Sequence, residues 1–281
     1  MQEVKKIILL MFRQFDFDQF DQVFQDILKL FSGHYPGYHR CNTLYHDLNH
    51  TMDCLLATAQ LIHGAFLNGI GFEQRDVNLG LIAAFMHDTG YIQALEDDKG
   101  TGGKYTLCHI ERSIEFMEKY FQDKVFPSDY TPICSNFLRC TGLDVKIAEI
   151  RFQSLEHEIL GKILGTADII GQMADENYLG KLPFLYNEFK EGGVPGYKDE
   201  FDLLEKTPAF WEMVKKRFGS DLGHVDGYMH DHFRVRWGID QDLYREAIDR
   251  NIEHLKALLG SLKANFSGKA KGHYQLGMIV A

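Results

Sequence analysis

Apolar residues recur along most of the chain at intervals of three and four, the spacing of one helix face, and no segment alternates in steps of two. The first 31 residues have a helical pattern, which ends in a turn at 34–37. Polar, glycine-containing loops are expected at 96–104 and 192–199. The pattern predicts an all-α fold. The main helices are expected over residues 46–66, 106–122, 154–174, 178–191, 208–217 and 242–262, with one more that ends at 87–88.

Polar residues beside the apolar runs indicate where several helices begin. Asp76, Thr131, Ser154 and Thr207 are the expected starts, and a proline directly follows each of the two threonines. No linker or repeat divides the chain, so a single multi-helix bundle is expected over residues 1–264. Residues 265–281 are polar and glycine-rich, and they are predicted to form a flexible tail.

One stretch raises the question of a membrane, because residues 54–72 contain no charged side chain over 19 positions. Gln60, His63, Asn68 and three glycines disfavour a spanning helix. The segment is therefore expected to be a helix buried on all sides of a core. The N-terminal residues 1–12 are predicted to form an amphipathic helix, not a signal peptide.

Composition narrows the class of partner. The chain has 281 residues and a formal net charge of −10, which argues against a polymeric nucleic-acid partner. Its five cysteines form no CxxC pair, and this pattern is typical of reduced thiols, so a cytoplasmic location is expected. An anionic small substrate would need local positive charge from a metal or from a few lysines and arginines.

Three separate segments contain candidate metal ligands. One apolar helical run ends in the adjacent pair His87 and Asp88, which is costly at the edge of a core unless a partner satisfies both side chains. His46 and His50 are four residues apart, which is one face of a helix. Asp168 is a lone carboxylate in another apolar helical run. Two nitrogen and two oxygen ligands, from His50, His87, Asp88 and Asp168, would suit a divalent metal with open coordination positions.

The order of these residues resembles the HD superfamily of metal-dependent phosphohydrolases, in which a histidine, a His-Asp dyad and a distant aspartate all lie on helices. The resemblance spans residues 50–168. Residues 45–50, Tyr-His-Asp-Leu-Asn-His, are similar to the tyrosine-histidine-asparagine-x-x-histidine signature of class I cyclic-nucleotide phosphodiesterases, with aspartate in place of asparagine. Residues 83–88, Ala-Ala-Phe-Met-His-Asp, are similar to the alanine-rich segment that leads to their dyad.

The resemblance implies a role for each residue. His50, His87, Asp88 and Asp168 would bind the metal, and zinc, magnesium, manganese, iron and nickel all fit such ligands. Asp88 would also belong to the catalytic centre. His46 would be the general acid, a role that typically contributes ~10²–10⁴-fold to the rate. The metal would lower the pKa of its water towards ~7, and the resulting hydroxide would attack phosphorus.

Further side chains are candidates for supporting roles. Some HD proteins hold a second metal with two more histidines; His109 is a candidate for one, but residues 130–144 contain no other. A second ion would then be weakly held, or His109 would contact the phosphate instead. Lys104, in the glycine-containing loop, is a candidate to reach an anion. A carboxylate, Asp47 or another, is expected to orient His46.

The expected function is hydrolysis of a phosphodiester of a cyclic nucleotide or a related small molecule, with no membrane partner. The alternatives are a nucleotide phosphomonoesterase, a non-catalytic nucleotide-sensing module and, ranked lower, a di-iron oxygenase on an HD-like scaffold. A second patch rich in histidine and aspartate, at 224–232, is interpreted as a solvated helix start and an interhelix contact, with a secondary metal site as the weaker interpretation.

Overall fold

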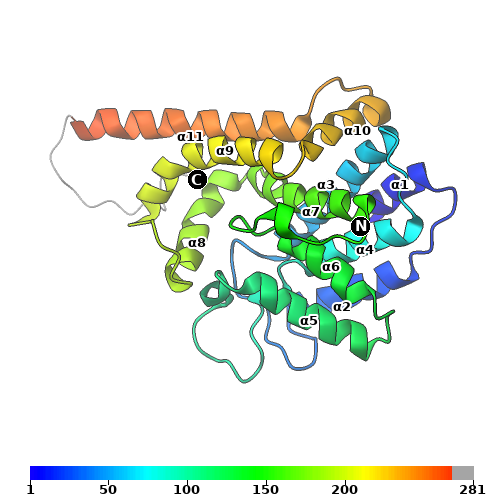
Figure 1. Ribbon diagram of the computed structural model, residues 1–281. Coiled ribbons are helices and arrows are strands. Elements are labelled where there is room, and N and C mark those ends of the chain that lie inside the picture. The colour runs from blue at the N-terminus through cyan, green and yellow to red at the C-terminus, as the bar shows by residue number, and fades with distance from the viewer. Residues whose placement is uncertain (268–281) are drawn as a thin grey trace.

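The computed structural model describes residues 1–267, which form eleven α-helices joined by turns and short 3-10 helices (Figure 1). The described residues contain no strand, and their one isolated bridge joins Tyr38 and Ala94. The predicted all-α fold is confirmed. The helices are α1 (Gln2–Met11), α2 (Asp18–Ser32), α3 (Leu48–Leu67), α4 (Gln74–Met86), α5 (His109–Asp123), α6 (Tyr130–Arg139), α7 (Leu155–Met173), α8 (Tyr178–Glu191), α9 (Glu200–Ser220), α10 (Tyr228–Trp237) and α11 (Leu243–Ser267).

Helices α3, α4 and α7 form the interior of the bundle. α3 packs against α7, and α4 contacts both. Every residue of α4 from Asp76 to Met86 is buried, because this helix is apolar on all sides. In Figure 1, α11 runs along one edge of the molecule beside α9 and α10, whereas α5 lies on the opposite side. The inner helices therefore provide a rigid frame for any residue placed at their ends.

The uncharged stretch at 54–72 covers the second part of α3 and the turn that follows it. The helix is buried from Cys54 to Ala65 apart from the half-buried Leu56, so the predicted core helix is confirmed for this part, whereas residues 67–69 are exposed beyond it. None of the described helices combines the length and the apolar character that crossing a membrane requires. The five cysteines are all free thiols.

The predicted start of α7 at Ser154 is confirmed, whereas the predicted start of α4 at Asp76 is not. Ser154 caps α7 as predicted, because its side chain accepts a hydrogen bond of 3.1 Å from the backbone N–H of His157. The prediction for Asp76 is wrong, since α4 begins after Glu73 and Asp76 lies in its first turn. The Asp76 carboxylate instead lies 3.0 Å from His157 Nε2, so it joins α4 to α7.

The predictions for the two Thr-Pro pairs are also wrong. α6 begins at Tyr130, and Thr131 is already inside its first turn. α9 begins at Glu200 and continues through Thr207 and Pro208. Asp199 caps it by accepting a hydrogen bond from a backbone N–H in its first turn. Burial of the apolar face of α9 outweighs the backbone hydrogen bond that the proline cannot make.

The predicted domain boundary falls near the end of the described chain. One cluster of buried side chains contains residues of helices from α1 to α11, and the single domain over 1–264 stays a prediction. α11 continues to Ser267, so the first three residues of the predicted tail, 265–267, are helical. The rest of that tail lies outside the described residues.

α3 and α10 approach each other closely through a small residue and a histidine pair. A Cβ added to Gly64 would lie 1.9 Å from the carbonyl oxygen of Tyr228, so only glycine allows this approach. Beside it, His63 and His232 are both buried, and their Nδ1 atoms are 3.1 Å apart. Burial, reinforced by the nearby Arg236, lowers the pKa of His63 to about 4 and that of His232 to about 3.

Because of this histidine pair, we expect the free energy of unfolding to fall in acid. Both pKa values are depressed on folding, so the unfolded chain binds more protons, and the stability present above pH ~6.5 falls as the pH drops towards the folded pKa values. Each histidine contributes roughly 1.4 kcal/mol per pH unit in this range. We expect the double variant His63→Gln/His232→Gln to show a flatter curve of unfolding free energy between pH 7 and 5. Urea unfolding with a chelator present measures this, and identical slopes for the two proteins would refute it.

Candidate metal centre and adjoining pocket

The four predicted metal ligands converge at the ends of the inner helices. His50 Nε2 lies 3.1 Å from His87 Nε2, 3.1 Å from an oxygen of Asp88 and 3.1 Å from an oxygen of Asp168. His87 Nε2 lies 3.2 Å from the same Asp88 oxygen and 3.6 Å from Asp168. One ligand atom each from His50, His87 and Asp168 lie within 4.8 Å of one another, the only such histidine, cysteine or carboxylate group found among the described residues.

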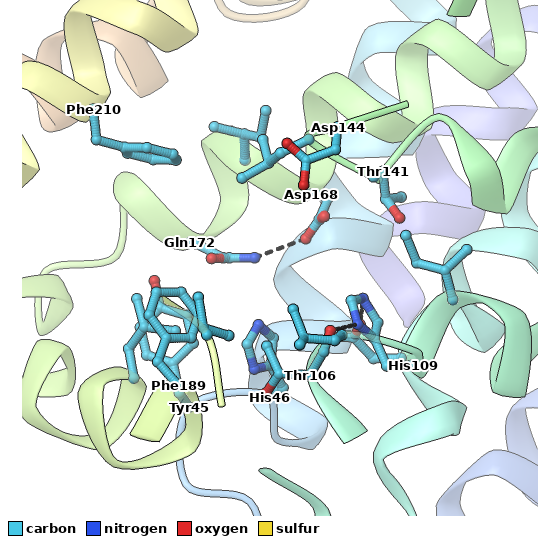
Figure 2. A pocket seen from close by; sticks show the side chains of 18 of the residues that line it. Tyr45, His46, Thr106, His109, Thr141, Asp144, Asp168, Gln172, Phe189 and Phe210 are labelled. Carbon is cyan, nitrogen blue, oxygen red and sulfur yellow. Dashed lines mark hydrogen bonds and ion pairs between the residues drawn. The ribbon is translucent and has the colours of Figure 1, made fainter. Parts of the chain in front are cut away.

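Local structure explains how each ligand reaches this point. His50 is in the first turn of α3, where its backbone N–H donates to the Asp47 side chain at 2.9 Å. His87 directly follows α4 and Asp88 comes next, so the end of this buried helix places both at the cluster. Asp168 faces them from the second half of α7, and its carboxylate accepts a hydrogen bond of 2.8 Å from Gln172 (Figure 2).

The hydrogen bonds of this cluster suit a cation at its centre. The Nδ1 of His87 lies 2.9 Å from the carbonyl oxygen of Ala84, which fixes a proton there and directs Nε2 into the cluster. The buried Oδ2 of Asp88 makes no hydrogen bond. Two ring nitrogens and carboxylate oxygens that converge in this way are the donor set that a divalent metal takes in place of the imidazole protons. The residues therefore fit the ion that the sequence implies.

The histidines and carboxylates of the cluster shift one another's pKa values. Burial lowers the pKa of His50, but the carboxylates of Asp168 and Asp88 outweigh it and raise this pKa to about 9. The pKa of His87 is likewise raised above its usual value, against the effect of burial, mainly by the charge of Asp88. In turn, the imidazoles hold the pKa values of both carboxyl groups below their usual range despite burial. The carboxylates are thus ionised at neutral pH.

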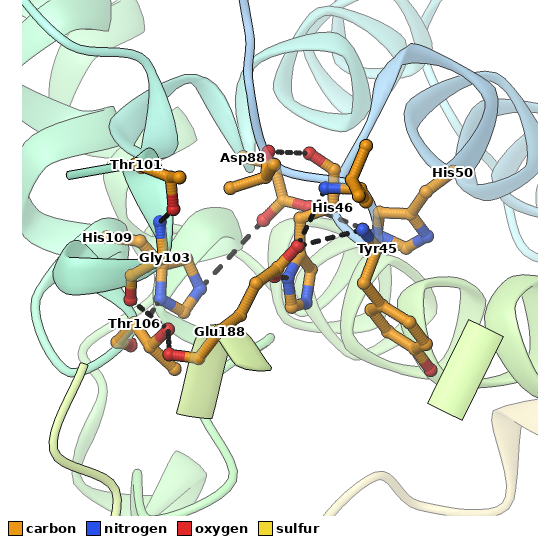
Figure 3. A network of polar contacts seen from close by, with 12 residues as sticks. Tyr45, His46, His50, Asp88, Thr101, Gly103, Thr106, His109 and Glu188 are labelled. Carbon is orange, nitrogen blue, oxygen red and sulfur yellow. Dashed lines mark hydrogen bonds and ion pairs between the residues drawn. The ribbon is translucent and has the colours of Figure 1, made fainter. Parts of the chain in front are cut away.

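His46 lies outside α3, so its predicted place on the same helix face as His50 is wrong. The helix begins only after Asp47, whose side chain caps it, and His46 precedes this cap. The predicted partner Asp47 is therefore engaged elsewhere. The Nδ1 of His46 lies 2.6 Å from a carboxylate oxygen of Glu188 on α8 (Figure 3). The other oxygen of Glu188 accepts the backbone N–H groups of Leu44 and Tyr45 at 3.0 and 2.8 Å.

Tyr91 joins His46 to His109, because both imidazole rings stack on its ring. Its ring centroid lies 4.4 Å from that of His46, at an interplanar angle of 9°, and 4.6 Å from that of His109, at 20°. Tyr91 is buried, so it restrains both histidines from one side. Gly90 makes the arrangement possible, because a Cβ there would lie 2.0 Å from the carbonyl oxygen of His109.

His109 begins α5 and lies beside the cluster. Its Nδ1 lies 2.7 Å from the carbonyl oxygen of Thr106, and its Nε2 lies 3.9 Å from Asp88 Oδ1 (Figure 3). Burial lowers its pKa, although the charge of Asp88 partly opposes this. His109 is therefore neutral at neutral pH, with Nε2 available to a ligand beside Asp88.

A pocket of about 470 Å³ opens beside these residues (Figure 2). His46, Asp88, His109 and Asp168 line it at one end. The rest of the wall consists of Tyr45, Tyr91, the segment 106–111, the segment 139–145 and residues of α7, α8, α9 and the loop between α8 and α9. A small molecule in this pocket would lie directly against the metal ligands and His46.

Lys104 does not take part, which corrects the prediction of an anion contact. Its Nζ lies 2.5 Å from the Asp97 carboxylate, within the 96–104 loop, and it does not line the pocket. The positive charge of Lys104 is therefore neutralised by a carboxylate of the same loop. In the patch at 224–232, His232 pairs with His63 and His230 lies 3.1 Å from Asp240, so these histidines point to different partners.

Fold and site together define an all-helical protein with a buried His-Asp cluster of metal-ligand type at the end of a pocket. The chain belongs to the Npun_R2479-like family, whose family model matches residues 14–227. All the candidate site residues lie within this match. No curated protein and no solved structure matches the chain.

Proposed function

We propose that this protein is a metal-dependent phosphohydrolase that cleaves a small phosphoester, as the resemblance to the HD superfamily suggests. The observation that carries the proposal is the convergence of His50, His87, Asp88 and Asp168 beside a pocket that His46 also lines. A metal-type cluster alone would fit many functions. A second histidine with its own buried carboxylate, next to the cluster but not in it, favours acid-base chemistry on a bound ligand.

The four ligands would hold a divalent cation between α3, α4 and α7. Such a cation, when bound, lowers the pKa of a water molecule and polarises a phosphoryl oxygen. Asp88 would contribute through Oδ2, which leaves Oδ1 directed towards His109. The gap between Asp88 and His109 is the place for a phosphate oxygen or for a second, weakly held ion.

His46 is proposed to donate the proton to the leaving group. Glu188 engages its Nδ1, which leaves Nε2 as the ring nitrogen able to serve a pocket ligand. In the net reaction, water supplies the new oxygen on phosphorus and the P–O bond to the leaving group breaks. The departing oxygen takes its proton from His46, and the proton lost by water restores His46. Tyr91 would keep the imidazole in place during this cycle.

The direct test is metal analysis of the purified protein followed by a hydrolysis screen. The screen contains cyclic nucleotides, dinucleotides, nucleoside monophosphates and a generic aryl phosphodiester, each with zinc, magnesium, manganese, iron or nickel. We expect about one tightly bound ion per chain and cleavage of a phosphodiester. Cleavage of monoesters alone would favour a phosphomonoesterase, and nucleotide binding without cleavage would favour a sensing module. Two irons with uptake of oxygen would replace the proposal by an oxygenase.

Asp168 provides a separate test because it lies 80 residues from Asp88 in the sequence. Asp168→Asn removes a carboxylate charge from the cluster, so we expect a marked loss of metal affinity. Asp175→Asn is the matched control: it removes a carboxylate that is paired with Lys181 beyond the C-terminus of α7. Metal titration of both variants decides. Unchanged affinity in Asp168→Asn would remove Asp168 from the ligand set.

A further inference from the structure

The walls of the pocket differ in chemistry from the end that holds the metal ligands. Away from that end, aliphatic and aromatic side chains of α7, α8 and α9 face the space, among them Met173, Leu185, Phe189 and Phe210 (Figure 2). Leu185, Phe189 and Phe210 are only half-buried. The pocket therefore leads from a charged end into an apolar chamber, which we define by these four residues.

The mouth of the pocket also exposes apolar surface. Leu107, just before α5, is 68% exposed, and Leu143, between α6 and α7, is 45% exposed. Both line the pocket. Exposed apolar surface of this kind is unfavourable in water, and a ligand with apolar groups would remove it from water by covering both side chains.

Several polar groups of the wall are engaged with the protein itself, and the Tyr45, Tyr178 and Tyr197 hydroxyls and the Asp144 carboxylate also line the pocket. The hydroxyls of Thr106, Thr141 and Thr207 donate to backbone carbonyls at 2.6, 2.9 and 2.9 Å. The Gln172 amide donates to Asp168. Because their donor hydrogens are used in this way, the three threonine hydroxyls offer little to the polar edge of a nucleobase or to ribose hydroxyls.

Positive charge is scarce in the pocket. Arg139 and Lys206 are the only lysine or arginine side chains that line it within the described chain. Arg139 pairs with Glu111 at 3.2 Å, and Lys206 pairs with Asp202 at 2.7 Å. A diphosphate or triphosphate would thus meet no free cation beyond the metal, so the wall favours a ligand with one phosphoryl group.

We propose that the substrate of this site is a phosphoester with a single phosphoryl group and an apolar aliphatic or aryl body that occupies the chamber. The inference rests on the proposed function for the phosphoryl group, and on the pocket wall for the rest. It replaces the nucleotide that the resemblance suggests. The phosphoryl group lies at the metal ligands, and the apolar body extends towards α8 and α9.

Matched substrates with one leaving group test this. Ethyl, butyl and hexyl p-nitrophenyl phosphate release the same p-nitrophenolate, and the p-nitrophenyl ester of thymidine 5′-phosphate supplies a nucleoside in place of the alkyl chain. Burying a methylene is worth about fourfold, so partial burial of four methylenes predicts at least a tenfold rise in kcat/KM from ethyl to hexyl. A flat series with the thymidine ester preferred would overturn the apolar assignment while leaving the phosphohydrolase in place.

A binding measurement keeps the two proposals separate. Ethyl-, butyl- and hexylphosphonic acid bind without being hydrolysed, and calorimetry of the full chain with added metal gives their affinities. If no ester is hydrolysed, the proposed function fails. An affinity that rises with chain length would still support the apolar chamber, and an unchanged affinity would overturn it.

Paired variants locate the effect. Leu185→Gln on α8 and Phe210→Gln on α9 place an uncharged polar group in the chamber, and each is expected to reduce the hexyl-to-ethyl ratio at least threefold. Phe184→Gln and Met213→Gln are their matched controls, because Phe184 and Met213 are 40% and 43% exposed on the same helices but do not line the pocket. Equal hexyl-to-ethyl ratios in all four variants would show that the alkyl group binds outside the chamber and would refute the proposal.

Discussion

His87→Ala and Asp88→Ala are each expected to abolish tight binding of a divalent cation while the helical fold persists. Both residues follow the end of α4, so their loss does not interrupt the helix. Each removes a ligand atom from a cluster in which His50 and Asp168 supply the others. Loss of an outer-shell partner typically costs 10–100-fold in metal affinity, and loss of a ligand is expected to cost more than ~100-fold. Metal content after dialysis and circular dichroism measure the two parts of the prediction.

The control for this pair is His157→Gln. His157 also forms a buried pair with a carboxylate, Asp76, but on another part of α4 and α7. This variant should keep its metal, since the pair lies outside the cluster. Full metal occupancy in both His87→Ala and Asp88→Ala would show that the cluster is structural and would remove the basis of the proposed function.

The second large effect concerns His46, which separates proton transfer from metal binding. His46→Ala should retain the metal, because its ring is held by Glu188 and Tyr91 rather than by the cluster. For a substrate with an alkoxide leaving group, turnover should fall by ~10²–10⁴-fold, since that oxygen needs a proton in the transition state. An aryl phosphodiester, whose leaving group carries its own charge, should lose far less. Rates with both substrates on the metal-loaded variant test this.

Glu188→Gln should follow the same pattern more weakly, because it leaves the imidazole in place but replaces the carboxylate that orients it through Nδ1. Glu191→Gln is the matched control one turn along α8, since that carboxylate holds the backbone N–H of Thr101 at 2.5 Å and has no contact with His46. Equal losses for alkyl and aryl substrates, or loss of metal from His46→Ala, would remove the proton-donor role.

The sequence predicted the parts of the site that are local in the chain. The pair at 87–88 is recognisable because an apolar run ends there, and Asp168 because no other charge lies in its segment. α8 was predicted with its observed ends, since Gly192 and the polar loop after it define its C-terminus. By contrast, the Thr-Pro pair at 207–208 resembles a helix start, and only the packing of α9 on the core reveals that the helix runs through it.

The parts that could not be predicted depend on contacts between distant segments. Glu188 lies 142 residues from His46, in a helix whose one other acidic residue, Glu191, contacts the loop at Thr101, and nothing in its own neighbourhood marks it. Tyr91 reads as an ordinary core aromatic, although it stacks on two site histidines. His46 was placed on α3 by its four-residue spacing from His50. The cap formed by Asp47 moves the helix start beyond it, a difference of two residues that decides which partner the imidazole meets.

The position of Glu188 has one more consequence, because α8, the helix that contains it, also lines the pocket. The carboxylate fastens this helix to the 44–46 segment, and Leu185 and Phe189 on the same helix face the chamber. The same helix thus sets both the position of the His46 partner and the shape of the chamber wall. A substitution that shifts α8 would therefore change both at once.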